Sequence, residues 1–409
     1  PQVTVTPRAD YCNCRAVSSR RLDIRGAISC RIVVTCPSKF VIPAMPDGMQ
    51  VLTKEISCCS EPITADKQVS VREEIETGAA GIDYIVTCDA LTRIDDIRII
   101  ANKAVVKGQV TISALYGVHN EEHSGCDELE KMTADIPVSQ ILDMPGLTDQ
   151  HMCAPEFIVR SCELIPRTDS GVISCELGLE CRCSAVRSVS MELPCDAYST
   201  EYETELTTAS LKIPSDPRKT EQPLTMKFTL SCDSGEVDSI WDCRCELSGV
   251  ACRPDGANGL TVSGQALVQA LGKCSGGTPF FAEKQESFEQ KLQSPDITQN
   301  TAAFCKCAVI NTGFAIKSDG TVDVTVQAMI TAELSETRQM NLVSGAEVHQ
   351  DKPRGKPDDF ALRICYTTGG ESCWDIAKRC GTTVEAVMEE NEITDRCAEL
   401  SGMVVIPIV

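Results

Sequence analysis

The chain alternates apolar and polar residues most clearly along Leu260-Thr261-Val262-Ser263-Gly264-Gln265-Ala266-Leu267-Val268. Such alternation predicts a β-strand with one buried face. The turn sequence Pro254-Asp255-Gly256 precedes it and follows another alternating run, which contains Cys243 and Cys245. Asp-Gly favours a hairpin loop, because both residues tolerate a positive φ. The two runs therefore predict a β-hairpin.

The same hairpin pattern recurs along the chain. Five expected first strands each carry a cysteine, namely Cys14, Cys88, Cys162, Cys245 and Cys307. Successive cysteines are 74, 74, 83 and 62 residues apart, which indicates a repeat of whole β-units. Three second strands carry a glycine (Gly26, Gly108 and Gly264), and a glycine inside a strand predicts a bulge or a close backbone approach.

We therefore expect a mainly β fold of tandem antiparallel β-domains, followed by a small β-α-α-β domain. The turn signals and the cysteine register place five β-repeat units at 1–77, 78–150, 151–213, 214–295 and 296–346. Residues 347–360 are charged, contain prolines and show no period, which is typical of an exposed linker. The last domain is expected at 361–409.

The overall charge limits the kinds of partner. With 38 Lys and Arg against 59 Asp and Glu, the net charge is −21, which argues against nucleic acid or anionic lipid as a partner. No apolar stretch approaches the roughly 20 residues of a membrane helix, so no membrane span is expected. No basic-then-apolar leader opens the chain, but the chain starts at Pro1, so a leader removed earlier stays possible.

Cysteine is unusually frequent, with 25 among 409 residues. Disulfides, metal ligation and small buried side chains all remain open as explanations, and the odd count leaves at least one cysteine outside intrachain pairs. C-x-C pairs place two sulfurs on one strand face, and they are one residue shorter than common zinc knuckles. No metal site is expected. The disulfide candidates are Cys12, Cys14, Cys88, Cys162, Cys243, Cys245, Cys305 and Cys307.

Catalytic signals are weak. The stretch His119-Asn120-Glu121-Glu122-His123 fits the H-x-x-E-H pattern of inverted zinc peptidases, but it lacks an apolar helical face and is interpreted as a polar loop. Neither a G-x-S-x-G elbow nor a G-x-G-x-x-G loop occurs. We expect no enzyme and no cofactor.

The C-terminal segment differs in kind from the β-repeats. Leu362-x-Ile364-x-Tyr366 predicts a short strand, and Ser372-Cys373-Trp374-Asp375 predicts a helix start with a capping box. A second helix is expected after Thr383, and residues 403–407 predict a closing strand.

This segment, 362–409, resembles a LysM domain, with Tyr366 to Ala377 standing at the family's signature and Asn391 at its Asn. The family binds N-acetylglucosamine polymers, chiefly peptidoglycan and chitin, in a shallow groove between two loops. The resemblance implies a carbohydrate-binding site made by Gly370, Glu371, Ser372 and Cys373 on one side, and by Ile393, Thr394 and Asp395 on the other. A LysM fold retained for protein contact is the alternative.

The β-repeats resemble the spore-coat-associated SPOCS domain. The stretches that carry the resemblance are 93–96, 102–110 and Ile136-Pro137-Val138-Ser139-Gln140-Ile141-Leu142-Asp143-Met144-Pro145-Gly146. In that family, tandem SPOCS domains followed by a LysM domain form a coat-morphogenesis protein of clostridia.

The resemblances imply a non-enzymatic structural or assembly protein in the spore coat or on the cell surface of a clostridial-type bacterium. Its partners would be peptidoglycan or another N-acetylglucosamine polymer, other coat or envelope proteins, and further copies of itself. The alternative is a self-assembling, disulfide-stabilised extracellular filament subunit, because β-units with unpaired edges add to one another.

Overall fold

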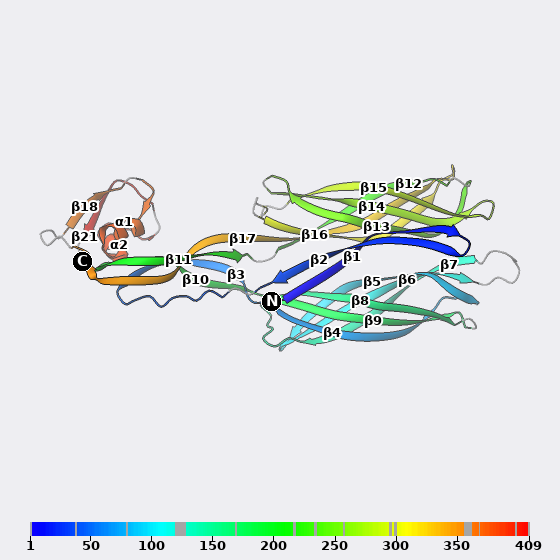
Figure 1. Cartoon of the computed structure of the whole chain (residues 1–409), viewed down its shortest axis with the longest axis horizontal. Coiled ribbons are helices and arrows are strands. Elements are labelled where there is room, and N and C mark those ends of the chain that lie inside the picture. The colour runs from blue at the N-terminus through cyan, green and yellow to red at the C-terminus, as the bar shows by residue number, and fades with distance from the viewer. Residues whose placement is uncertain are drawn as a thin grey trace. The chain divides into compact units, whose positions relative to one another are not determined.

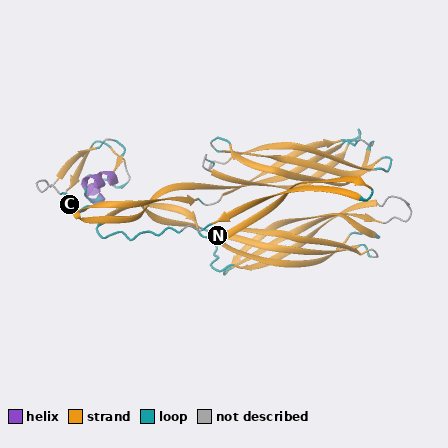
Figure 2. Cartoon of the chain, viewed as in Figure 1, coloured by secondary structure: helices purple, strands orange, loops and turns teal. Residues whose placement is uncertain are grey.

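The computed structural model describes residues 2–36, 39–78, 81–118, 128–167, 170–215, 218–232, 235–256, 258–293, 297, 301–355, 362–367, 369–396 and 399–407. The fold is mainly β, with several antiparallel sheets and two short helices near the C-terminus (Figure 2), as the sequence predicts. The chain divides into two compact units. The first comprises Pro1–Thr35, Cys59–Ser188 and Asp216–Glu336, and the second comprises Cys36–Cys58, Val189–Ser215 and Thr337–Val409.

The first unit contains a six-stranded sandwich, which we call sandwich A (Figure 1). Its strands are β4 (Ile63–Glu76), β5 (Ile82–Ile100), β6 (Lys103–Val118), β7 (Glu128–Asp143), β8 (Met152–Arg167) and β9 (Val172–Val186). They form two sheets with the strand orders β4-β9-β8 and β5-β6-β7. The first strand, β4, therefore pairs with the last strand, β9, although the other four strands lie between them in the sequence.

The same arrangement occurs a second time in this unit, as sandwich B. Its strands are β12 (Arg218–Leu230), β13 (Val237–Pro254), β14 (Gly259–Cys274), β15 (Pro279–Gln293), β16 (Thr301–Ile316) and the first part of β17 (Val322–Pro353). The β13-β14-β15 sheet matches β5-β6-β7, and β17 lies between β12 and β16 as β9 lies between β4 and β8. The two sandwiches thus share one strand order.

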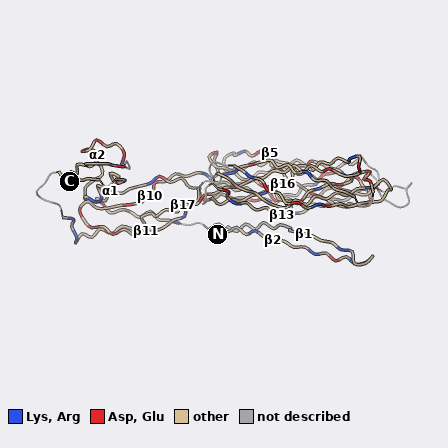
Figure 3. The backbone as a smooth tube through the Cα atoms, turned by 90° about the horizontal axis from the view of Figure 1, so that it is seen from above, with Lys and Arg blue, Asp and Glu red and all other residues tan. Residues whose placement is uncertain are grey.

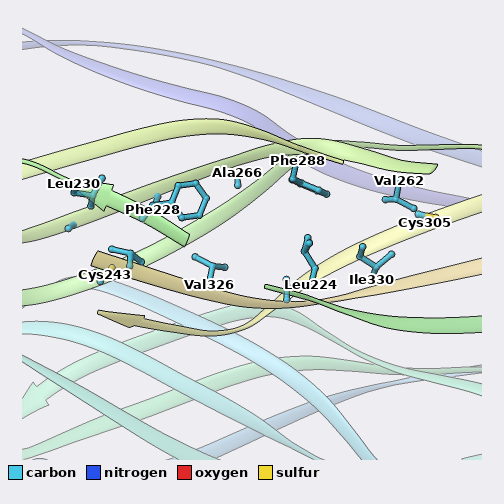
Figure 4. Packing of buried hydrophobic residues seen from close by; sticks show 14 of the residues in the cluster. Leu224, Phe228, Leu230, Cys243, Val262, Ala266, Phe288, Cys305, Val326 and Ile330 are labelled. Atoms are coloured by element: carbon cyan, nitrogen blue, oxygen red, sulfur yellow. The ribbon is translucent and has the colours of Figure 1, made fainter. Parts of the chain in front are cut away.

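Each sandwich has its own apolar core, because alternate residues of its strands point inward. In sandwich A, Val106, Val110 and Ile112 of the central strand β6 are fully buried. In sandwich B, Phe228, Val262, Phe288, Val326 and Ile330 pack together from four strands (Figure 4). The C-x-C pair Cys181 and Cys183 points into core A from one face of β9, as expected for residues two apart.

Two of the three second-strand glycines, Gly108 and Gly264, lie opposite bulges, whereas Gly26 pairs with Cys12 and its backbone approaches the Tyr11 carbonyl oxygen closely. Gly108 faces the bulge between Ile94 and Asp96, and a Cβ there would approach the carbonyl oxygen of Arg93 to 2.1 Å. Gly264 lies opposite the bulge between Ser248 and Ala251, where a Cβ would come within 3.1 Å of the Ser248 carbonyl oxygen. Only glycine leaves room for the bulged backbone at these positions.

A two-stranded hairpin of β1 (Gln2–Ser18) and β2 (Arg21–Thr35) also belongs to the first unit. It exposes many large apolar side chains, among them Leu22, Ile24 and Ile28, which are 63 %, 64 % and 73 % exposed. Arg31 of β2 stacks on the ring of Phe304 in β16, with 3.2 Å between the guanidinium carbon and the ring centroid.

The second unit combines two strand pairs with the C-terminal domain. β3 (Met49–Cys59) pairs with β10 (Ser188–Ser199), and β11 (Tyr202–Pro214) pairs with the second part of β17. Their apolar residues, including Ile56, Leu193 and Leu342, form a small core. The C-terminal domain contains β18 (Leu362–Tyr366), β19 (Glu371–Ser372), α1 (Cys373–Cys380), α2 (Val384–Glu390), β20 (Glu399–Leu400) and β21 (Met403–Pro407).

All five predicted hairpins are present, as β1–β2, β5–β6, β8–β9, β13–β14 and β16–β17. The sheets, however, combine strands from different predicted units: β4 lies in 1–77 and pairs with β9, which lies in 151–213. The unit boundaries stay a prediction.

The predicted linker at 347–360 is wrong over its first half. Residues up to Pro353 continue β17 and pair with β11, for example Glu347 with Glu205 and His349 with Glu203. This part of β17 is rich in exposed charged residues because it belongs to a short two-stranded sheet, so its composition resembles that of a linker. Residues 356–361 lie outside the described residues, as does the stretch His119–His123.

We expect Gly108→Ala to destabilise the protein by about 3 kcal/mol, because the new methyl group meets backbone that cannot move without breaking the bulge. Urea unfolding of Gly108→Ala and of a control variant measures the change in the free energy of unfolding. The matched control is Gly313→Ala, since a Cβ at Gly313 on β16 meets nothing closer than 4.0 Å. Equal unfolding midpoints for the two variants would contradict the bulge argument.

Candidate functional site

The C-terminal domain begins its first helix with the predicted capping box. Ser372 accepts a hydrogen bond from the backbone N–H of Asp375 at 3.3 Å, and the Asp375 carboxylate accepts from the backbone N–H of Ser372 at 2.9 Å. The Ser372 hydroxyl also donates to Asp375 at 2.7 Å. These bonds hold the pKa of Asp375 below its ordinary value. Ser372 is therefore committed to the helix start.

Asn391 connects the second helix to the last strand. Its side-chain amide donates to the carbonyl oxygens of Val387 at 2.8 Å and Val405 at 2.7 Å. The backbone N–H of Val405 donates back to its side-chain oxygen at 2.8 Å. Asn391 thus has a structural role: it satisfies the end of α2 and fixes β21 beside it.

The domain is fixed to β10 through Asp196. The Asp196 carboxylate accepts hydrogen bonds from Trp374 Nε1 at 2.8 Å and from Lys378 Nζ at 2.6 Å. Trp374 is only 3 % exposed and meets the ring of Tyr198 edge-on, with 5.0 Å between the ring centroids.

Tyr198 and Arg354 add two more connections. Burial raises the pKa of Tyr198, so its hydroxyl stays protonated and donates to the carbonyl oxygen of Thr382 at 2.8 Å. Arg354 donates from Nη1 to the carbonyl oxygen of Lys378 at 3.1 Å. Helix α1 is thus fixed at several points to the strands of the second unit.

The first predicted site loop presents backbone and one ion pair. Gly370 is exposed with φ 79°, a conformation that favours glycine. Glu371 is half-buried and forms an ion pair with Arg379 at 3.3 Å. Cys373 is fully buried in the domain core, so its side chain faces the core instead of a surface groove.

The second predicted site loop follows α2. Ile393 donates its backbone N–H to the carbonyl oxygen of Met388 at 2.9 Å, and its half-buried side chain packs on the core. Thr394 and Asp395 are exposed. The β19–β20 pairing places Glu371 opposite Leu400 and Ser372 opposite Glu399, shortly after this loop. Exposed candidates on both loops are thus Gly370, Thr394 and Asp395.

The disulfide candidates fall into three environments. Cys12 and Cys14 are exposed on β1, whereas Cys243 and Cys305 are buried and Cys245 and Cys307 are half-buried. Cys88 and Cys162 lie together, with 3.3 Å between their sulfur atoms. Among the described residues, no group of three or more potential ligands is placed to hold a metal ion.

Burial also makes three of these thiols, Cys88, Cys243 and Cys245, poor nucleophiles near neutral pH. It raises the pKa of Cys243 and of Cys245 to about 11, and it is the main cause that raises the pKa of Cys88 to about 12. The thiolate is the reactive and metal-binding form, so these groups stay protonated near neutral pH.

Comparison with known families identifies two domains. A family model described as "SipL, SPOCS domain" matches residues 81–164, and a LysM domain model matches residues 368–396. No curated protein and no solved structure matches the chain. The chain therefore contains a SPOCS domain, in β5 to β8 of sandwich A, and a C-terminal LysM domain. The LysM resemblance is confirmed, the SPOCS resemblance is confirmed over residues 81–164, and neither matched domain is catalytic.

The described residues include no helix that is both long and apolar enough to cross a membrane.

We expect Asp196→Ala to shift the Trp374 emission maximum to longer wavelength and to destabilise the second unit by about 2 kcal/mol, because the buried indole N–H loses its acceptor. The measurement uses a Trp241→Phe background, in which Trp374 is the only tryptophan. Asp196→Asn is the matched control, since it keeps an acceptor for the indole. An unchanged emission in the Asp196→Ala variant would contradict the proposed anchoring.

Proposed function

We propose that this protein is a non-enzymatic structural or assembly protein of a bacterial spore coat or cell envelope. The observation that carries the proposal is the presence, in one chain, of a SPOCS domain at 81–164 and a LysM domain at 368–396. The first connects the chain with spore-coat assembly, and the second with binding to peptidoglycan or a related N-acetylglucosamine polymer.

The proposed glycan site lies on the two LysM loops. Gly370 leaves the backbone of the first loop accessible, and Thr394 and Asp395 add a hydroxyl and a carboxylate on the second. Such groups suit the hydroxyl and N-acetyl groups of a sugar, above the half-buried side chain of Ile393. A coat protein bound by the same loops is the alternative ligand.

The β-sandwiches support a scaffold role. They supply long strands along which both basic and acidic residues occur (Figure 3), on a chain whose net charge is −21. Partners on the coat or envelope would be other proteins and the glycan, and not nucleic acid. Localisation in the spore coat or on the surface of a clostridial-type bacterium belongs to this proposal.

A self-assembling extracellular filament is the second candidate function. The hairpin β1–β2 favours it, because it exposes apolar side chains together with the thiols of Cys12, Cys14 and Cys30. An exposed apolar surface of this kind favours association with another protein surface.

Sedimentation of the full chain with purified peptidoglycan tests the proposal. We expect saturable binding that Thr394→Trp weakens about tenfold, because the new ring would cover the proposed site between the two loops, a loss of about 1.4 kcal/mol. Thr208→Trp, at an exposed position on β11, is the matched control and should bind like the unchanged chain. A bound fraction no higher than that of an unrelated acidic protein would contradict glycan binding.

Sedimentation of the protein without glycan, under oxidising conditions, distinguishes the scaffold function from the filament function. Protein that stays in solution as a monomer there contradicts the filament, whereas self-pelleting that a reductant reverses supports it.

A further inference from the structure

In the described part of the chain, several pairs of cysteines bring their side chains together, and three of these pairs join separate segments of the fold. The distances between sulfur atoms are 3.3 Å for Cys88 and Cys162, 3.2 Å for Cys232 and Cys274, and 3.9 Å for Cys365 and Cys380. A disulfide needs about 2.05 Å, so the sulfur atoms of each pair must still come about 1 to 2 Å closer to form a bond. The pairs lie in sandwich A, sandwich B and the LysM domain, one in each.

Each pair joins two segments that no strand ladder connects. Cys88 lies on β5 and Cys162 on β8, which belong to different sheets of sandwich A and are edge strands of those sheets. Cys232 follows β12, whereas Cys274 ends β14 in the other sheet of sandwich B. Cys365 lies on β18 and Cys380 at the end of α1. A covalent bond at these places would add a connection that backbone hydrogen bonds do not provide.

The seam between the two sheets brings cysteines together in both sandwiches. In sandwich B, β13 and β16 correspond to β5 and β8, and there the side chains of Cys252 and Cys305 are in hydrogen-bond contact. The fold thus places thiols from the second and fifth strands beside each other in both copies.

We propose that Cys88–Cys162, Cys232–Cys274 and Cys365–Cys380 form three intramolecular disulfides when the protein meets an oxidising environment. Each bond forms by thiol–disulfide exchange with a small-molecule disulfide. Because burial raises the pKa of Cys88 and of Cys162, this pair reacts slowly at neutral pH, through the small fraction of thiolate. The thiolate of one cysteine attacks the reagent and releases one thiol, and the second cysteine then displaces the other thiol. The two cysteines lose two electrons and two protons in all, and the reagent is reduced to two thiols.

The bonds would stabilise the folded protein mainly by restricting the unfolded chain. This stabilisation increases with the length of the loop that the bond closes. The cysteines of the three pairs are 74, 42 and 15 positions apart. The bond in sandwich A closes the longest loop, so its loss should lower the melting temperature most.

Peptide mapping under non-reducing conditions tests the proposal on the full chain. The reduced, folded protein is incubated with oxidised glutathione, the remaining thiols are alkylated, and the chain is digested at acidic pH to prevent exchange. We expect three linked peptide pairs, each lighter by two hydrogen atoms than its separate peptides, and a lower melting temperature after reduction. Alkylation of all six thiols would overturn the proposal.

Cys175 supplies the sharpest control. Its thiol also contacts that of Cys162, because the two cysteines are diagonal neighbours on β8 and β9. In this register, Cys162 lies opposite Leu177, and Cys175 lies opposite Leu164. Cys175→Ala should keep the Cys88–Cys162 bond, and Cys88→Ala should remove it while the other two bonds persist. A Cys162–Cys175 bond in the unchanged chain would overturn the assignment in sandwich A. The map of the unchanged chain decides this even if a variant fails to fold.

Discussion

The pairing of the first strand with the last closes each six-stranded sandwich, and the rest of the fold depends on it. All 14 residues of β4 pair with β9, and all 13 residues of β12 pair with β17. A hairpin alone is only marginally stable, so the hairpins of this chain need the additional strand to bury their apolar faces. The cost is a long loop that must close before the pairing can form, which favours slow folding.

β17 contributes strand pairings to both units. Its first part pairs with β12 and β16, and from Thr337 onward it pairs with β11 as a single continuous strand. The LysM domain then packs on β10 through Asp196 and Tyr198. The LysM domain is thus fixed to the strands of the second unit through Asp196 and its neighbours.

The sequence predicts the local elements well, because their signals are local. Alternation predicts the five hairpins, Gly108 and Gly264 predict bulges, and Ser372 with Asp375 predicts the capping box. The partner of β4 could not be predicted, since an alternating strand fits many neighbours equally well. Asp196 lies 178 positions before Trp374, and nothing in the residues around Asp196 distinguishes it from other acidic residues on strands. The side chain of Cys373 lies in the domain core because it belongs to the buried apolar face of α1, and the carbohydrate site that includes this residue stays a prediction.

Hydrogen exchange of the backbone amides, resolved to single strands, tests the closure of the sandwiches most directly. If the first strand pairs with the last, β4 exchanges as slowly as β8 on the other side of β9, and β12 as slowly as β16 on the other side of β17, while β1 and β2 exchange faster. Rapid exchange in β4 and β12, beside protected hairpins β8–β9 and β16–β17, would contradict the closed six-stranded sandwich.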